Sequence, residues 1–263
     1  MPAKGAPIHV IEAPTEEPRD LHGLDGIEVE AVTRTFRTRR GDVQALAGMT
    51  LHARANEIVT VVGPSGCGKT TLLEIVCGLQ VPDRGIARSA PAALMPQRDL
   101  LLPWLSAIDN AGLALRARGV PRDEARAAAA PWMERFGLGG FERMRPAELS
   151  GGMRQRVSFL RSLLAGKPVL ALDEPFAGLD AITRYEMQNW LATVLAMEPR
   201  TVVLVTHDVE EAVVLGDRVV VMSPRPGRAV ASLEIDLSRP RQRTDRPVVE
   251  LRERALEALG VQS

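Results

Sequence analysis

The residues best suited to chemistry in this sequence form a glycine-rich run that ends in a lysine and a threonine. Residues 63–70 read Gly-Pro-Ser-Gly-Cys-Gly-Lys-Thr and match the pattern G-x4-G-K-[ST] between an apolar run and a helical pattern. Glycines let backbone N–H groups close around phosphate oxygens, and the helix that follows adds the positive end of its dipole. Lys69 would place a positive charge at the β- and γ-phosphates, and Thr70 would offer its hydroxyl to Mg²⁺. The run predicts binding of a nucleoside triphosphate such as ATP. The candidate binding residues are Gly63, Pro64, Ser65, Gly66, Cys67, Gly68, Lys69, Thr70 and Thr71.

Two carboxylates stand together at the end of a second apolar run, where residues 169–175 read Val-Leu-Ala-Leu-Asp-Glu-Pro. In enzymes with a phosphate-binding loop, an acid at such a strand end holds Mg²⁺, and we expect Asp173 to do so together with Thr70. The adjacent carboxylate can polarise the attacking water, so Glu174 is the candidate general base. Acids at strand ends are also common as helix caps. The combination with the glycine-rich run favours metal and water chemistry.

Short apolar runs that alternate with helical patterns indicate how the chain positions these residues. Residues 57–63, 168–175 and 201–208 are β-branched or leucine-rich runs flanked by helical sequence. Strands of this kind alternating with helices are typical of a parallel sheet with crossover helices, which predicts an α/β fold. The alternation of apolar and acidic residues in 27–31 and the run 43–51 predict two further strands.

The remaining segments predict a helical region, a terminal helix and a mobile leader. From about residue 100 to residue 165 the composition is mostly helical. Residues 1–26 are rich in proline, glycine and acidic groups and show no sustained period, which is typical of a mobile leader. Near the other end, apolar residues fall on one helical face: Val248, Leu251, Ala255, Leu256 and Leu259.

Composition and charge exclude several classes of protein. The 263 residues carry 33 Lys and Arg against 33 Asp and Glu, and this zero net charge argues against an electrostatic nucleic-acid binder. No apolar run reaches the ~18 residues of a membrane span, and the first residues lack the apolar core of a secretory signal. Two cysteines make neither a disulfide framework nor a metal cluster by themselves. His9, His22 and His52 have no partners at ligand spacing and are expected to be structural or solvent-facing.

A third motif gives the sequence a specific resemblance. Residues 149–156 read Leu-Ser-Gly-Gly-Met-Arg-Gln-Arg, and here the chain resembles the ATP-binding cassette (ABC) family. The signature motif of that family is LSGGQ-like, and Met153 stands in place of its glutamine. Ser150, Gly151 and Gly152 precede a helical pattern, so they can offer free N–H groups and a positive dipole end to a γ-phosphate. The same residues also fit a simple helix N-cap, and both interpretations use the same N–H groups.

Further positions are similar to other motifs of this family. Gln97 resembles the Q-loop glutamine, which implies a metal ligand and a catalytic residue. Residues 177–180 resemble the D-loop, so Asp180 is a candidate binding residue that would also cap the next helix. His207 follows an apolar run and resembles the switch histidine that contacts the γ-phosphate. Phe36 looks like the aromatic residue that stacks on adenine, where the family more often has tyrosine.

The resemblance covers about residues 27–240 and implies a fold and an assembly. The implied fold is the P-loop NTPase of ABC type: a mostly parallel sheet core, an antiparallel β region and a helical subdomain at about residues 100–165. Residues 241–263 would form a C-terminal tail with an amphipathic helix. The implied assembly is a head-to-tail homodimer of ATPase subunits. Each ATP, with Mg²⁺, would lie between the glycine-rich loop of one subunit and the signature motif of the other.

The arrangement of motifs narrows the class of cassette protein. Chromosome-maintenance ATPases insert long heptad arms between the two halves, and the interval from Lys69 to Ser150 is short and has no sustained heptads. Translation-factor relatives carry two cassettes in one chain, whereas this sequence contains one. Exporters commonly fuse the cassette to membrane helices, and this sequence has no apolar run of that length. The sequence therefore predicts a separate ATPase subunit that docks on an integral membrane permease. It would be a peripheral protein at the cytoplasmic face of the inner membrane.

The segment after Gln97 resembles one importer subfamily. Residues 95–105 contain Leu-Leu-Pro-Trp, a recurrent feature of the nitrate/sulfonate/taurine importers. Pro96, where that subfamily usually has phenylalanine, also resembles ATPase subunits for pyrimidine-type thiamine precursors. The sequence of the ATPase subunit therefore does not identify the solute. In such an importer the solute would be recognised by the permease and by a periplasmic or lipid-anchored solute-binding protein.

Two alternatives remain at this stage. Trp104 is expected on the segment that meets the permease, and a buried position in the core is equally open. The runner-up function is a soluble ABC-type ATPase switch that acts on nucleic acid or ribosomes. Neutral charge and the lack of a basic stripe count against it and predict no nucleic-acid partner.

Overall fold

A computed structural model describes residues 8–9, 26–39 and 41–260 of the chain. Within these residues the main sheet has seven strands, in the order β1-β10-β9-β4-β8-β7-β6. The strands from β9 to β6 run parallel, and β10 and β1 add an antiparallel edge. These strands are β1 (Ile8–His9), β4 (Ile58–Val62), β6 (Ala92–Met95), β7 (Val169–Asp173), β8 (Thr201–Thr206), β9 (Arg218–Met222) and β10 (Ala229–Glu234).

The central strands β4, β7 and β8 are buried along their whole length, which explains their continuous apolar sequence. Their side chains divide between two cores, one on each face of the sheet. Val59 and Val61 of β4 pack with α1 (Lys69–Val76) and the second sheet. Ile58 and Val62 of the same strand pack in the other core, with α6 (Ala181–Met197) and α7 (Val209–Leu215). The predicted parallel sheet with crossover helices is confirmed.

The second sheet is antiparallel and contains β2 (Ile27–Thr38), β3 (Gly41–Ala53) and β5 (Arg84–Ser89) in the order β3-β2-β5. The strands predicted in 27–31 and 43–51 therefore form. Pairing is irregular after Val29, where Ala31 has a φ of 47°. Opposite this bulge, Gly85 has a φ of 85°, and a Cβ there would lie 2.4 Å from the Glu30 carbonyl oxygen. Only glycine fits such a close approach of two backbones.

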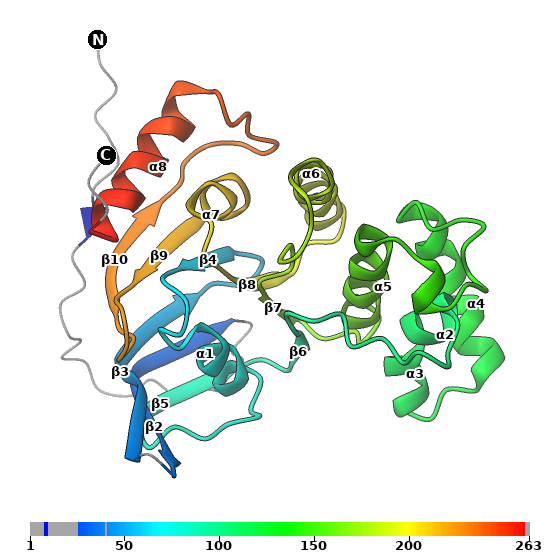
Figure 1. The fold of residues 1–263 in the computed structure, drawn as a ribbon, viewed down its shortest axis with the longest axis horizontal. Coiled ribbons are helices and arrows are strands. Elements are labelled where there is room, and N and C mark those ends of the chain that lie inside the picture. The colour runs from blue at the N-terminus through cyan, green and yellow to red at the C-terminus, as the bar shows by residue number, and fades with distance from the viewer. Residues whose placement is uncertain (1–7, 10–25, 40, 261–263) are drawn as a thin grey trace.

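A group of helices forms the end of the molecule farthest from α8 (Arg246–Ala258) in Figure 1. These elements fall inside the region expected to be helical by composition. Asp109 anchors the group, because its buried carboxylate accepts hydrogen bonds from the guanidinium groups of Arg122 and Arg126. The helices are α2 (Ala107–Ala111), α3 (Leu113–Ala117), α4 (Arg122–Arg135) and α5 (Gly151–Leu163), with a 3-10 turn at Pro146–Glu148.

The terminal segments pack on the main sheet. Helix α8 (Arg246–Ala258) buries Val248, Leu251 and Ala255 against the core that contains α7, as the amphipathic pattern predicts. Ile8 and His9 pair with β10, although they fall within the stretch expected to be a mobile leader. The open edge of β10 offers unpaired backbone groups to such a segment. Apart from these two residues and residue 26, the expected leader 1–26 lies outside the described residues. Across the described part of the chain, no helix has the length and apolar character needed to cross a membrane.

Candidate functional site

Four neighbouring parallel strands end at one edge of the main sheet, and a candidate residue follows each of them. Strand β4 leads into the 63–70 loop, β8 precedes His207, β7 ends at Asp173 beside Glu174, and β6 precedes Gln97. In open α/β sheets, ligands bind outside the carboxyl ends of the strands. A cavity of about 480 Å³ opens there. Its lining residues are Phe36, Val43, Ala45, Ser65, Gly66, Gly68, Lys69, Thr70, Thr71, Gln97, Glu174 and Arg225.

The glycine-rich loop has the backbone that a phosphate nest needs. Gly66 and Gly68 have φ values of 75° and 109°, and a Cβ on Gly68 would lie 2.8 Å from the Ala45 carbonyl oxygen. Lys69 is 5% exposed, and its Nζ donates to the backbone carbonyl oxygens of Gly63 at 2.8 Å and Pro64 at 3.2 Å. The ammonium group is therefore held inside the loop, where a phosphate oxygen could reach it.

Three of the candidate loop residues do not line this cavity among the residues that the structure describes. Gly63 and Pro64 serve Lys69 through their carbonyl oxygens. Cys67 is 1% exposed, and a Cβ on Gly63 would lie 3.0 Å from its Sγ, so its side chain packs behind the loop. Burial raises the pKa of the Cys67 thiol, which keeps it neutral.

Two of the three expected metal ligands, Thr70 and Asp173, are in direct contact next to Lys69. The Thr70 hydroxyl donates to Oδ2 of Asp173 at 2.8 Å, and Asp173 is 5% exposed. Burial raises the pKa of the Asp173 carboxyl, against the hydrogen bond from Thr70. Gln97 uses its amide nitrogen on Glu174, which leaves its carbonyl oxygen as a further ligand. Hydroxyl, carboxylate and carbonyl oxygens are the ligands that Mg²⁺ prefers, so this donor set fits that ion.

Glu174 is the point where the candidate side chains converge. Its Oε2 accepts a hydrogen bond from Nε2 of Gln97 at 3.2 Å and lies 3.1 Å from Nδ1 of His207. Its Oε1 lies 3.7 Å from Nζ of Lys69. The residue has a φ of 43°, and its own N–H donates to the carbonyl oxygen of Val205 on β8. This left-handed turn directs the carboxylate of Glu174 into the cavity instead of along the strand.

The signature and D-loop residues lie elsewhere in the subunit. Ser150 begins α5, and its Oγ accepts a hydrogen bond from the Met153 N–H at 3.2 Å. Asp180 begins α6, and its Oδ1 accepts from the N–H groups of Ile182 and Thr183, each at 3.1 Å. Hydrogen bonds that the Asp180 carboxylate accepts from Thr183 lower the pKa of this carboxyl. Ser150 and Asp180 are both helix N-caps, which confirms the capping interpretation of each in the sequence analysis. Among the described residues, the cavity lining includes none of Ser150, Gly151, Gly152 or Asp180.

Two further residues of the cavity lining are an aromatic residue and an arginine. Phe36 lies on β2 in the lining, and the Arg34 guanidinium carbon is 5.0 Å from the centre of its ring. Arg225, in the loop after β9, also lines the cavity and was missed by sequence reasoning. Its one available signal was a positive charge in the Ser-Pro-Arg-Pro-Gly-Arg run at 223–228, which has no standard spacing from the glycine-rich loop.

The segment after Gln97 carries exposed apolar side chains on a fixed backbone. Trp104 is 68% exposed and Leu100 is 58% exposed, so the core alternative for Trp104 is wrong within this subunit. The backbone below them is tied to α5, because Arg161 donates to the carbonyl oxygens of Asp99 and Leu100. Arg154 of the same helix donates to the Asp99 carboxylate at 3.1 Å. The segment and the signature helix therefore form one unit.

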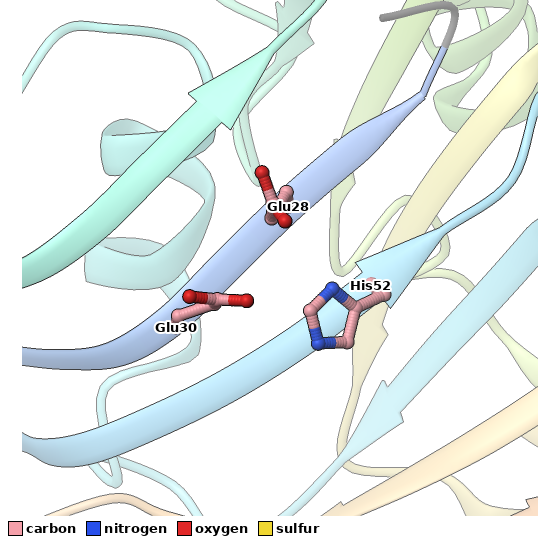
Figure 2. Close-up of side chains that lie close together, drawn as sticks. All are labelled: Glu28, Glu30 and His52. Carbon is pink, nitrogen blue, oxygen red and sulfur yellow. The ribbon is translucent and has the colours of Figure 1, made fainter. Parts of the chain in front are cut away.

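A second group of metal-ligating side chains lies on the antiparallel sheet, away from this cavity. Figure 2 shows Glu28 and Glu30 of β2 beside His52 of β3, which is the strand partner of Glu28. One ligand atom from each lies within 4.8 Å of the others. Sequence spacing does not indicate this group, because strand pairing creates it. The guanidinium of Arg88 lies 3.7 Å from the Glu28 carboxylate, so a cation already pairs with one of the ligands.

Comparison with known proteins finds one family model and several relatives whose descriptions agree with one another. A sequence model of the family described as "ABC transporter" matches residues 46–177. The chain is 43% identical over 234 residues to an aliphatic sulfonates import ATP-binding protein of Burkholderia lata, covering 86% of this chain and 84% of that protein. It is 42% identical over 196 residues to a formylaminopyrimidine import ATP-binding protein of Halalkalibacterium halodurans, covering 73% of this chain and 79% of that one.

A solved structure supports the fold and the assembly of such proteins. It is a dimeric ATP-binding cassette in a post-hydrolysis state with bound ADP and Pi. It is 26% identical to this chain, with a TM-score of 0.71, and the match covers 81% of this chain and 100% of that one.

Proposed function

This chain belongs to the ABC transporter family and is an ATP-binding, ATP-hydrolysing subunit, and we propose that it drives solute import as a head-to-tail homodimer docked on a membrane permease. One observation carries the assignment of its active site. Lys69, Gln97 and His207 reach one carboxylate, Glu174, beside the hydrogen-bonded pair Thr70 and Asp173.

Each of these side chains has a defined task in hydrolysis. Lys69 binds the β- and γ-phosphates with an ammonium that the loop carbonyls already orient. Mg²⁺ held by Thr70, Asp173 and Gln97 would neutralise charge that develops on the phosphates. Glu174 accepts a proton from the attacking water. His207 contacts the γ-phosphate, and its hydrogen bond to Glu174 orients the base.

The second half of the site comes from the partner subunit in this proposal. Ser150 is exposed at the start of α5, and Gly151 and Gly152 form the first turn, where N–H groups and the helix dipole favour an anion. They do not line their own subunit's cavity in the part of the chain described here. A dimer that places them over the partner's nucleotide resolves this, and the dimeric neighbour with ADP and Pi supports such an assembly. Asp180 would lie at the same interface.

The partner at the membrane would be an integral permease. Leu100 and Trp104 present an exposed apolar surface on the segment after Gln97, and aromatic anchors of this kind are typical of interfaces. We place the subunit at the cytoplasmic face of the inner membrane as a peripheral protein. A periplasmic or lipid-anchored solute-binding protein would deliver the solute to the permease.

The proposed solute is a sulfonate or taurine-like anion, or a pyrimidine precursor of thiamine. Relatives with similar identity carry import names for aliphatic sulfonates and for formylaminopyrimidine. These names favour an importer over the soluble switch on nucleic acid or ribosomes.

Hydrolysis and uptake test the proposal separately. Lys69→Ala should abolish ATP hydrolysis by the purified subunit, because the phosphates lose their cation. Near-parental turnover would overturn the site assignment. Uptake is measured in cells that lack this gene, with taurine, an alkanesulfonate and formylaminopyrimidine as labelled solutes. These cells should fail to take up one of the three solutes. The parent gene should restore that uptake, whereas the gene with Lys69→Ala should not. Normal uptake of all three would overturn the proposed solute class.

A further inference from the structure

The tail between β10 and α8 holds helix α7 with arginines at alternate positions. Arg239 donates to the carbonyl oxygen of Leu215, the last residue of α7, at 2.9 Å. Arg241 is 6% exposed and donates to the carbonyl oxygens of Val213 and Val214 at 2.7 and 3.3 Å. These bonds satisfy carbonyl groups that a helix end leaves free, and a guanidinium suits the negative end of the dipole. The tail therefore fixes the C-terminal end of α7.

Arg243, two residues further along, connects α7 to a second helix. Its Nε lies 3.0 Å from Oε1 of Glu210 on α7. Its NH2 group donates to Oε1 of Gln188 on α6, and its guanidinium carbon lies 4.2 Å from the ring centre of Tyr185 on the same helix. The planar guanidinium thus binds one helix through a carboxylate and the other through an amide and an aromatic face. Arg243 fixes the spacing between α6 and α7.

Both of these helices begin at loops that bear candidate site residues. Helix α6 starts at its N-cap Asp180. Helix α7 starts at its N-cap Asp208, directly after His207. A shift of α7 against α6 would therefore move the His207 imidazole relative to Glu174, with which it now lies in hydrogen-bond contact at 3.1 Å.

A buried hydrogen bond links the Arg243 contact to residues near His207 and Glu174. Because Gln188 gives its oxygen to Arg243, its nitrogen is free to donate to Oε2 of Glu211 on α7, at 3.3 Å. Glu211 is 4% exposed. It lines a small cavity of about 10 Å³ together with His207 and Glu174.

We propose that Arg243 is a positioning residue for ATP hydrolysis: by joining Gln188 of α6 to Glu210 of α7, it holds His207 in register with Glu174. The inference rests on the proposed function and extends it to a residue outside the cavity. Loss of Arg243 leaves α8 docked through Val248, Leu251 and Ala255, so the subunit stays folded.

The test compares Arg243→Gln with a matched arginine variant three residues further along, at the start of α8. Arg246→Gln removes an arginine whose side chain is 90% exposed and whose partner, Glu250, lies on its own helix. Arg243→Gln should lower kcat by roughly 2- to 30-fold, the range of coupling through such contacts, with the KM for ATP unchanged. Arg246→Gln should match the parent. Gln188→Leu keeps the pair between Arg243 and Glu210 and the contact with Tyr185, but it removes the hydrogen-bonding partner of Arg243 on α6, so it should also lower kcat.

A spectroscopic readout separates positioning from loss of fold. The chain has only 4 histidines, so the ring resonances of His207 can be assigned with a His207→Ala variant. These resonances should move in Arg243→Gln and in Gln188→Leu but not in Arg246→Gln. Parental kcat, or an unmoved His207 signal, in both Arg243→Gln and Gln188→Leu would overturn the proposal. That result leaves the proposed function intact if Lys69→Ala is inactive, whereas an active Lys69→Ala variant overturns the proposed function itself.

Discussion

At the scale of single residues, the site is organised around one carboxylate with three polar neighbours. Gln97 and His207 both contact Oε2 of Glu174, and Lys69 lies near Oε1. A carboxylate held in this way needs little reorganisation when it takes a proton from water. Its neighbour Asp173 has a different environment, since it is buried and bonded to the Thr70 hydroxyl. Adjacent acids in different surroundings can take different roles.

The first residue-scale prediction separates these two acids. Glu174→Gln keeps the shape of the side chain but loses the charge that accepts the proton, so hydrolysis should fall by about 10²- to 10⁴-fold. ATP should still bind through Lys69, and the ATP-bound dimer should accumulate. In size-exclusion chromatography it should elute earlier than the monomer. Asp173→Asn is the control, because it should weaken Mg²⁺ binding and give no stable dimer. Parental hydrolysis in Glu174→Gln would make His207 the next candidate base.

A second residue-scale prediction concerns the buried acid Glu211. Burial, with a smaller contribution from Asp208, raises the pKa of this carboxyl to about 8, against favourable contacts from Thr206, Gln188 and Arg184. The folded state therefore holds a proton that the unfolded chain releases near pH 4.5. The stability of the protein due to this group is full below that pH and is lost as the pH rises toward 8.

Glu211→Gln removes this titration and tests it. The variant should gain stability relative to the parent as the pH rises from 5 to 8.5, on the order of 1 to 4 kcal/mol at the upper end. Urea unfolding at both pH values measures the difference. An equal stability difference at the two pH values would contradict a raised pKa. Asp208, Arg184, His207 and Glu174 also face this position, so His207→Ala provides a control for their titration.

At the scale of elements, helix α5 links the signature residues to the segment that would meet the permease. Ser150 caps the start of α5, while Arg154, Ser158 and Arg161 further along it bind Asp99 through its side chain and carbonyl oxygen. A movement imposed on residues 99–104 would therefore carry α5 with it. The bonds from Arg154 and Arg161 in this link are charge-assisted, and such bonds are stronger than bonds between neutral groups.

The element-scale prediction uses the exposed tryptophan on this segment. Because Trp104 is 68% exposed, Trp104→Ala should leave the melting temperature of the isolated subunit nearly unchanged. It should weaken association with the permease and reduce uptake, as loss of an interface anchor does. Co-purification with the permease and thermal unfolding of the free subunit check the two parts. A large fall in melting temperature with normal association would favour a packing role instead.

At the scale of the whole molecule, the candidate site residues fall into two groups, one at an edge of the main sheet and one at the starts of α5 and α6. Four neighbouring strands bring the glycine-rich loop and the candidate catalytic groups to one edge of the sheet. The caps at Ser150 and Asp180 stand outside that cavity, on helices that start elsewhere. Closed, symmetric dimers are the usual way in which such incomplete surfaces are completed.

The whole-molecule prediction tests completion in trans. Ser150→Arg should suppress hydrolysis but leave ATP binding to the single subunit intact, since in the proposed dimer this side chain would act on the partner's nucleotide. Mixing Ser150→Arg with Lys69→Ala creates mixed dimers with one doubly altered site and one unaltered site. If the sites act independently, about a quarter of the parental rate should return, because half of randomly formed dimers are mixed. A mixture that recovers no activity would mean either that hydrolysis needs both sites intact or that the trans arrangement is wrong. A disulfide crosslink between a Ser150→Cys subunit and a Ser65→Cys subunit distinguishes these outcomes, because it forms only if the two positions meet across the dimer.

The sequence by itself determined what depends on neighbouring residues. The spacing from Gly63 to Thr70 specifies the phosphate loop, because the turn, the glycine conformations and the helix start are all local. The strand ends and the amphipathic face of α8 followed from short-range periodicity for the same reason. The segments with Ser150 and Asp180 were found by resemblance to a family, and their residue types also fit helix caps. Resemblance to a family added Gln97 and His207, whose roles no local pattern specifies.

Only the tertiary structure decided which distant residues meet. The order β4-β8-β7-β6 brings His207 and Gln97 onto Glu174, and strand pairing sets His52 beside Glu28. The exposure of Trp104 and the bridge made by Arg243 depend likewise on how helices pack against each other. Periodicity shows that a face is apolar, but many partners can cover the same face. The choice among them is made by the packing of the whole chain, because burial energy is not directional and only a close-packed arrangement satisfies every polar group at once.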